Sequence, residues 1–265
     1  MSVDLKKVWD HVVKYRVPHV QEEFPLILFW SQKSGCTTLA KWFYDQIGLL
    51  DEALAYNEWI HFYDQEVYKN KANYRDKLFE IAVSGEKDAF KLVRNPYTRA
   101  VSQFMILLTS KSLYWNQEWE KIRSVLYGDK DREKGITFKQ FLGYIRDHQE
   151  MADNHFHPQY TEGEENFVQH YIHLENFTTE IKQLESTYQL KTSNIKKLAN
   201  SSHHMKKSMV LKGDWADREL TNESFIGIGR FPTYESFYDK EAIRLVNDIF
   251  QKDFEIYGYE RRSGS

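Results

Sequence analysis

The clearest pattern along the chain is an apolar run that gives way to a helical pattern within a few residues. Residues 26–30 (LILFW) are apolar throughout, which is typical of a strand covered on both faces in a parallel sheet. A short polar stretch follows, and residues 37–47 then have the pattern of a helix with Gly48 as its expected cap. The pattern predicts a strand, a loop and a helix, which is half of a βαβ unit.

Other segments extend this alternation of strands and helices. Residues 4–16 carry apolar side chains at helical spacing and predict a packing helix. Residues 89–93 predict a second strand, and Pro96 suits the first turn of the helix after it. Residues 64–82 predict a polar helix, whereas residues 51–63 fit neither pattern clearly. Together the segments predict an α/β fold with a central parallel sheet flanked by helices.

Length and composition favour a single α/β domain over residues 1–265, with residues 1–20 as an N-terminal helix packed on it. The net charge of -3 argues against a general nucleic-acid binder, so any anion site is local. The single cysteine, Cys36, excludes an intramolecular disulfide. No apolar run approaches the roughly 20 residues that span a bilayer, and the N-terminus lacks an uninterrupted signal-peptide core. We therefore expect a soluble, cytoplasmic protein with no membrane span.

The polar stretch after the first strand has the composition of a phosphate-binding loop. A loop of this kind presents backbone N–H groups at a helix N-terminus, where they lack intrahelical partners and attract an anion. Lys33 precedes Gly35 by two residues, whereas the common GxxxxGK[ST] loop places its lysine after the last glycine. This order argues against an ATPase or a kinase. The residues that we expect to bind the phosphate are Lys33, Ser34, Gly35, Cys36, Thr37 and Thr38.

A second candidate phosphate site follows the second predicted strand. Arg94 lies at the end of that strand, and Ser102 lies two turns into the helix that begins near Pro96. A folded strand-turn-helix can bring both side chains toward one phosphate, the guanidinium as a fork of donors and the serine as a hydroxyl. The chain thus has two separate phosphate-binding motifs.

The two motifs together resemble those of sulfotransferases that use 3′-phosphoadenosine 5′-phosphosulfate (PAPS), and within them the carbohydrate sulfotransferases of family 2. In that family a PK-x-G-[CT]-T loop binds the 5′-phosphosulfate and R-[DN]-P-x-x-R-x-x-S binds the 3′-phosphate. This sequence has Gln32 where proline is usual and Tyr97 where phenylalanine is common. The resemblance implies the P-loop-containing nucleoside triphosphate hydrolase-like sulfotransferase fold. It also implies a PAPS-dependent sulfotransferase (EC 2.8.2 type).

Later segments resemble the same family. Residues 154–159 (NHFHPQ) are similar to the H-W-x-P-Q segment of chondroitin- and dermatan-type enzymes, and the end of the chain resembles their terminal helix. Residues 106–135 and 190–235 align poorly, and we expect them to form acceptor-side or nucleotide-covering segments. In relatives a late basic loop closes over the nucleotide, which makes Lys206 and Lys207 candidates, although a solvated charge run explains them equally well.

Sulfuryl transfer needs an acceptor hydroxyl in line with the sulfur, a base and a positive charge on the leaving phosphate oxygen, and this scheme requires no metal. We assign Lys33 to the leaving oxygen, where preorganised donors are typically worth about 10²–10³ in rate. His61 is the leading candidate for the base, because related enzymes place a catalytic His or Glu in this interval and histidines titrate near neutrality. Glu58 is its rival, since glutamate-type glycosaminoglycan sulfotransferases have a similar NE-x-x-F segment. His155 and His157 remain further candidates.

Three classes of function account for parts of the sequence. A sulfotransferase explains the lysine-first loop and the Arg94/Ser102 motif together, and the family implies a hydroxylated saccharide or glycoconjugate as acceptor. A P-loop nucleotide or small-molecule kinase explains the first loop only, and the chain lacks a clear acidic strand for magnesium. A non-catalytic nucleotide-binding module would keep the phosphate contacts without the base.

Overall fold

A three-stranded parallel sheet organises the N-terminal part of the molecule. The computed structural model describes residues 4–110, 112–131, 133–199 and 205–264. In it β1 (Leu26–Phe29), β2 (Asp88–Val93) and β3 (His170–His173) lie in the order β1-β2-β3, and both pairs are parallel. All of β1 is buried, as expected for a strand covered on both faces. The predicted α/β fold with a central parallel sheet is confirmed.

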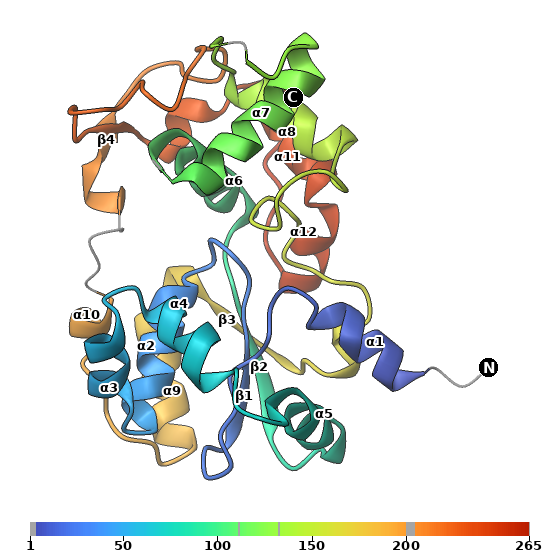
Figure 1. Ribbon diagram of the computed structural model, residues 1–265, viewed down its shortest axis with the longest axis vertical. Coiled ribbons are helices and arrows are strands. Elements are labelled where there is room, and N and C mark those ends of the chain that lie inside the picture. The colour runs from blue at the N-terminus through green and yellow to red at the C-terminus, as the bar shows by residue number, and fades with distance from the viewer. Residues whose placement is uncertain (1–3, 111, 132, 200–204, 265) are drawn as a thin grey trace. The chain divides into compact units, whose positions relative to one another are not determined.

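Helices cover both faces of this sheet, as Figure 1 shows for α2 and α9 on one face and α1 and α5 on the other. Alternate side chains of a strand point to opposite faces, so Leu28 packs with the aromatic residues of α2, whereas Phe29 packs with Trp9 of α1. The helices around the sheet are α1 (Leu5–Val12), α2 (Cys36–Gln46), α3 (Leu50–Tyr56), α4 (Ile60–Phe62), the π-helix η1 (Tyr63–Tyr68), α5 (Tyr74–Ser84), the 3-10 helices η2 (Glu164–Asn166) and η3 (Leu174–Asn176), α9 (Phe177–Thr187) and α10 (Ile195–Leu198).

The polar helix expected over residues 64–82 is wrong in this form. The chain instead forms η1 and then α5, with a turn between them. Asn73, at the N-terminus of α5, has a φ of 61°, a left-handed conformation that interrupts any right-handed helix. Residues 51–63, whose pattern was ambiguous, contribute to α3 and α4.

The chain divides into two compact units, each with its own core. The first unit, Met1–Arg94 with Tyr160–Ser201, contains the sheet, and the second comprises Asn95–Gln159 and Ser202–Ser265. This division reflects contacts and not independent folding. The single domain expected over residues 1–265 therefore stays a prediction.

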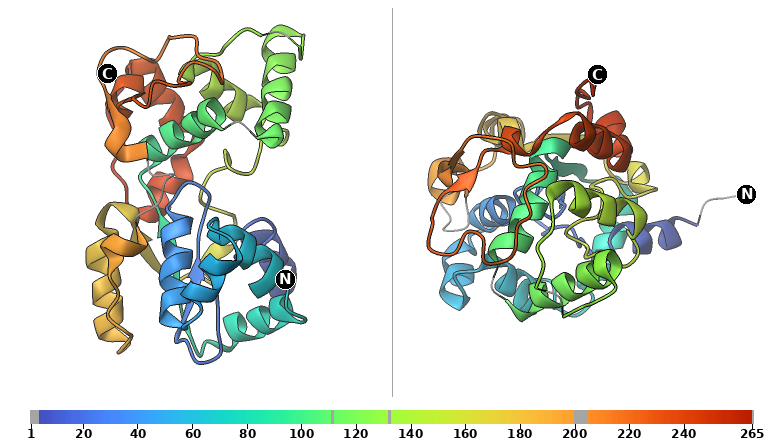
Figure 2. Two further views of the ribbon diagram at one scale, coloured as in Figure 1. Left: turned by 60° about the vertical axis from the view of Figure 1, so that its left-hand side comes forward. Right: turned by 90° about the horizontal axis from the view of Figure 1, so that it is seen from above.

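The second unit is mainly helical, and α8 and α11 pack against each other in its core (Figures 1 and 2). The ring of Phe104 lies 5.2 Å from that of Phe141 and 5.9 Å from that of Phe237. Pro96 occupies the first turn of α6, as predicted, behind an Asn95 cap. The elements of this unit are α6 (Pro96–Thr109), α7 (Leu113–Tyr127), α8 (Phe138–Asp147), η4 (Met205–Ser208), β4 (Met209–Leu211), β5 (Phe231–Pro232), η5 (Tyr234–Phe237), α11 (Lys240–Ile249) and α12 (Gln251–Tyr257).

No helix within the described part of the chain combines the length and the apolar composition that a membrane crossing requires. The longest helices, α6 and α7, have 14 and 15 residues. At about 1.5 Å per residue, neither reaches the roughly 30 Å of a bilayer core.

Candidate nucleotide site

The phosphate loop, residues 33–38, joins β1 to α2 at the carboxyl end of the strand. Gly35 precedes the first turn of α2 with a φ of 97°, a left-handed conformation, and a Cβ atom there would lie 2.6 Å from Cδ1 of Leu174. The buried Ser34 hydroxyl accepts a hydrogen bond from the Ser31 N–H (3.2 Å) and donates one to the Ser31 carbonyl (2.5 Å). The loop is therefore closely held just before the helix N-terminus, which is where an anion binds.

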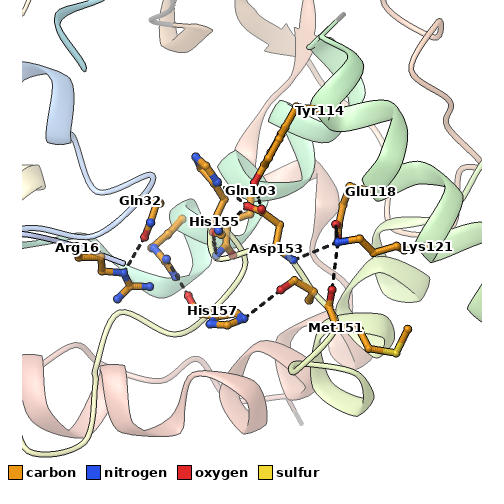
Figure 3. A network of polar contacts seen from close by, with 12 residues as sticks. Arg16, Gln32, Gln103, Tyr114, Glu118, Lys121, Met151, Asp153, His155 and His157 are labelled. Carbon is orange, nitrogen blue, oxygen red and sulfur yellow. Dashed lines mark hydrogen bonds and ion pairs between the residues drawn. The ribbon is translucent and has the colours of Figure 1, made fainter. Parts of the chain in front are cut away.

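One arginine contacts this loop directly, and a second contacts the residue that precedes it. Arg94 follows β2, the strand beside β1, and its Nη1 donates to the Lys33 carbonyl at 3.0 Å. Arg16 is buried, and its Nε donates to Oε1 of Gln32 at 2.7 Å, as the dashed line in Figure 3 marks. Arg94 was predicted from its motif. Arg16 was not, since no sequence pattern distinguishes it from other arginines.

His61 lies against the same loop. Its Nε2 atom is 3.1 Å from Oγ1 of Thr37 and 3.7 Å from Sγ of Cys36, and its ring centroid is 5.5 Å from that of Trp59. Glu58, the rival base in this segment, is exposed and forms no hydrogen bond or ion pair with another residue that the structure describes. Of the two candidates between the loop and β2, the geometry brings His61 to the loop.

The electrostatics of Cys36 show that this part of the loop favours negative charge. Burial on its own raises the pKa of the Cys36 thiol, but the imidazole of His61 and the ammonium of Lys33 outweigh burial, and the pKa lies below its ordinary value. Surroundings that stabilise a thiolate also stabilise a phosphate or sulfate oxygen. The loop thus combines the backbone position of an anion site with side chains that favour negative charge.

His155 belongs to the second unit, where Asp153 orients it (Figure 3). The Nδ1 atom of His155 lies 2.5 Å from Oδ1 of Asp153, and that carboxylate also accepts a hydrogen bond from the Tyr114 hydroxyl. Burial raises the pKa of Asp153, but the hydrogen bond and charge of His155 outweigh it and hold this pKa below its ordinary value. The Asp153 N–H in turn donates to the buried Glu118.

His157 is held by backbone atoms of its own unit. Its Nε2 lies 3.0 Å from the Gln149 carbonyl and 3.1 Å from the Ala152 carbonyl, and these contacts hold the ring against its own unit. Gln159, the last residue of the H-W-x-P-Q-like segment, is fully buried, and its N–H donates to Asp253 of α12 at 2.9 Å. This segment therefore fixes loops and helices of the second unit.

The remaining predicted nucleotide residues also lie in the second unit. Ser102 is buried in α6, whereas Arg94 belongs to the first unit, so their joint binding of one phosphate stays a prediction. Lys206 and Lys207 lie in η4, and Lys207 is exposed. His203 and His204, which precede them in the same basic cluster, fall outside the described residues. Among the residues with described positions, no three His, Cys, Asp or Glu side chains form a group that could hold a metal ion.

A loop like that of residues 33–38 at the carboxyl end of a parallel strand, with an arginine that follows the neighbouring strand on its backbone, is the arrangement by which many α/β proteins bind phosphorylated ligands. The model of the sulfotransferase family matches residues 19–260, nearly the whole chain. The chain belongs to the sulfotransferase family, which confirms the resemblance to family 2 and the expected fold. Its reaction class is sulfuryl transfer, and its acceptor carries a hydroxyl group. No curated protein and no solved structure matches the chain in the corresponding comparisons.

Proposed function

We propose that the chain transfers the sulfuryl group of PAPS to a hydroxyl of a saccharide or glycoconjugate, with His61 as the base and Lys33 as the leaving-group cation. The observation that carries this proposal is the 3.1 Å contact between Nε2 of His61 and Oγ1 of Thr37. It places an imidazole at the first turn of α2, where the family's loop binds the phosphosulfate. The proposed site thus combines a proton acceptor with an anion cradle.

The proposed step is a single displacement at sulfur. The acceptor oxygen forms a bond to sulfur as the bond between sulfur and the 5′-phosphate oxygen breaks, and the hydroxyl proton passes to Nε2 of His61. Negative charge grows on the departing phosphate oxygen, where the Lys33 ammonium and the first-turn N–H groups of α2 stabilise it. The products are the sulfate ester and 3′-phosphoadenosine 5′-phosphate (PAP), and no metal takes part in this scheme.

The choice of His61 over the other candidates rests on position. Glu58 points to no described partner and is exposed, and His157 is held by two carbonyl oxygens. His155 has the orienting carboxylate that a base needs, but it belongs to the other unit. His61 alone among the four combines an imidazole with direct contact to the loop.

Aromatic side chains near His61 support a saccharide acceptor. Trp59 is 36% exposed, and its ring contacts that of His61. Phe62 is 46% exposed and lies in α4 beside His61. Exposed aromatic faces beside a reactive group suit the apolar faces of sugar rings, which stack on them. They add a structural reason to the family resemblance on which the acceptor class otherwise depends.

The nucleotide part of the proposal is tested by thermal unfolding with different nucleotides. We expect PAP and PAPS to raise the melting temperature, because a ligand at about 100 times its dissociation constant adds roughly 2.7 kcal/mol to the free energy of unfolding. ATP with magnesium should have little effect. Equal stabilisation by ATP would contradict the proposal and would favour a kinase.

The base is tested by assaying His61→Ala and Glu58→Ala side by side with labelled PAPS and a panel of saccharides. His61→Ala should lower kcat by about 10²–10⁴ and leave the PAP-induced shift in melting temperature unchanged. Glu58→Ala is the matched control and should stay near wild type. The opposite result assigns the base to Glu58, and transfer to no acceptor would favour a nucleotide-binding module.

A further inference from the structure

A buried polar cluster lies behind the helix that carries His61. The Asp64 carboxylate is 2% exposed and accepts hydrogen bonds from the Tyr44 hydroxyl at 2.6 Å and from Nζ of Lys69 at 2.8 Å. Nε2 of His19 lies 3.0 Å from the same carboxylate. Burial raises the pKa of Asp64, but His19 and Lys69 outweigh burial and keep this pKa well below its ordinary value. The carboxylate is therefore ionised, and the role assigned to His61 makes no use of it.

Asp64 and Lys69 are joined across a π turn. The Lys69 N–H donates to the Asp64 carbonyl at 2.9 Å, the five-residue spacing of a π-helix, and the two side chains form their ion pair over the same interval. On an α-helix, side chains three or four residues apart face each other, and those five apart do not. The ion pair thus fits the π turn and would be broken by an ordinary helical turn.

This π turn is connected to the phosphate loop on two sides. The helix α4, which carries His61, runs into η1 without a break. Nζ of Lys69 also lies 5.5 Å from the Trp30 ring centroid, and that ring lies 6.3 Å from the ring of His61. Trp30 and Lys69 both donate to the Val17 carbonyl, at 2.9 and 2.7 Å. Loss of the Asp64–Lys69 ion pair would therefore be expected to alter the position of His61 by two routes, through the helix backbone and through the ring of Trp30.

We propose that Asp64 and Lys69 are positioning residues, whose ion pair holds the π turn so that His61 faces Thr37 and Cys36 of the phosphate loop. The proposal rests on the proposed function only in the role given to His61. Stability alone does not explain the pair, because a buried ion pair is often no more stable than apolar residues of similar size. Its geometry fits the departure from α-helical spacing that begins at Tyr63, two residues after His61.

Cys36 provides a readout that needs no enzyme activity, because it is the only cysteine and its thiol lies 3.7 Å from His61. The charged groups that act on it are His61, Lys33 and Lys69. The pH dependence of its alkylation by iodoacetamide reports the thiol pKa. If His61 moves away from the loop, this pKa rises and the thiolate fraction at pH 7 falls. Alkylation at pH 7 then slows in proportion to the thiolate that is lost.

Comparison of Asp64→Asn in the wild-type and His61→Ala backgrounds separates positioning from a direct charge effect. Removal of the Asp64 charge would by itself lower the Cys36 pKa, but it also removes the partner that raises the pKa of the buried Lys69, and loss of the Lys69 charge would slow alkylation in either background. Displacement of His61 slows alkylation only where His61 is present. We expect slower alkylation at pH 7, by about three- to tenfold. We also expect no further slowing when Asp64→Asn is combined with His61→Ala, since residues that act through one group are not additive.

Unchanged or faster alkylation in Asp64→Asn would overturn the proposal. The proposal would also be wrong if Asp64→Asn slowed alkylation in the His61→Ala background as much as it does in the wild-type background. Should Asp64→Asn fail to fold, the pair Asp64→Asn/Lys69→Gln, which leaves no unpaired buried charge, decides by the same measurement. Lys69→Arg keeps the charge and the bond to Asp64 and should retain wild-type alkylation. In the enzyme assay, kcat should fall and the KM for PAPS should stay constant.

A second buried ion pair gives a matched control. Nζ of Lys91 lies 2.5 Å from Oε2 of Glu164, and both residues are buried in the first unit. Lys91 alternates with Leu92 on β2, so it faces away from the side of the sheet where Leu92 packs with α2. The pair Lys91→Gln/Glu164→Gln should lower stability without changing Cys36 alkylation. If it slows alkylation as much as the Asp64 variants do, the effect is general loss of packing and the positioning role is wrong.

Discussion

Replacement of Gly35 by alanine places a methyl group where the phosphate loop meets the end of the sheet. Two separate costs follow from the structure. The backbone at Gly35 has a φ of 97°, and the new Cβ atom would lie 2.6 Å from Cδ1 of Leu174 and 3.4 Å from Cδ2 of Leu92. Both leucines carry flexible side-chain ends, but Leu92 lies within the packed core around α2 and Leu174 is packed against it.

The expected loss of stability is the sum of these costs. A left-handed backbone costs an alanine about 1–2 kcal/mol, and the reduced entropy of the unfolded chain returns roughly 0.4–1 kcal/mol. An extra methyl group forced into a packed site typically costs about 1–3 kcal/mol more. We therefore expect Gly35→Ala to lower the free energy of unfolding by about 1–5 kcal/mol, with a central value of about 3 kcal/mol.

Gly48 provides the control, because its φ of 73° is also left-handed and no atom lies within 4 Å of a Cβ built there. Gly48→Ala should cost only the backbone part, about 1 kcal/mol. Urea unfolding of both variants, with Leu174→Ala added to each, isolates the contact. Gly35→Ala should couple to Leu174→Ala by about 1 kcal/mol or more, and Gly48→Ala should not. Equal losses at the two glycines would refute the argument that close approach to Leu174 adds to the cost at Gly35.

The remaining predictions concern Lys33 and Asp153. Lys33→Ala should fold and should lower kcat by about 10²–10³ with a smaller rise in the KM for PAPS, since the lysine acts on charge that forms in the transition state; steady-state kinetics showing the reverse would assign Lys33 to ground-state binding. The pKa of the Asp153 carboxyl is lower in the folded state than in the unfolded chain. The ionised carboxylate therefore stabilises the folded state at pH values above its ordinary pKa near ~4. This stabilisation is lost as the pH falls through the folded-state pKa. Urea unfolding should therefore show a stability gap between wild type and Asp153→Asn that narrows as the pH falls below about 4, and a gap independent of pH would contradict the role of His155 in this pair.

The strand-loop-helix at residues 26–47 could be predicted from the sequence because its order depends on local features. A continuous apolar run, a lysine-glycine loop and a helical pattern follow one another within about two dozen residues. The helix expected over 64–82 could not be predicted correctly, because its division depends on a left-handed Asn73 and on a π turn. That turn fits an ion pair with the buried Asp64, and burial of a carboxylate is a tertiary property.

The residues of the candidate site likewise fall into those that the sequence could predict and those that it could not. Lys33, Gly35 and Arg94 belong to motifs with fixed spacing, and the structure places Arg94 on the loop backbone. The preference for His61 over Glu58 could not be decided by spacing, since the two residues are three positions apart, and only the folded chain brings one imidazole to Thr37. Arg16 was missed because its hydrogen bond to Gln32 joins segments with no shared pattern.

The hydrogen bond between Arg16 and Gln32 restricts the backbone before the phosphate loop, a restriction that the family usually obtains from a single proline. A proline at the position of Gln32 restricts φ whether or not the rest of the protein is folded. A hydrogen bond from Arg16 restricts the loop only while the segment before β1 is in place. Order in the phosphate loop and order near the N-terminus are therefore thermodynamically linked, and the linkage is reciprocal. If the loop binds the nucleotide as proposed, the bound nucleotide should also protect the segment before β1 from local unfolding, and damage to that segment should weaken binding without touching a binding residue.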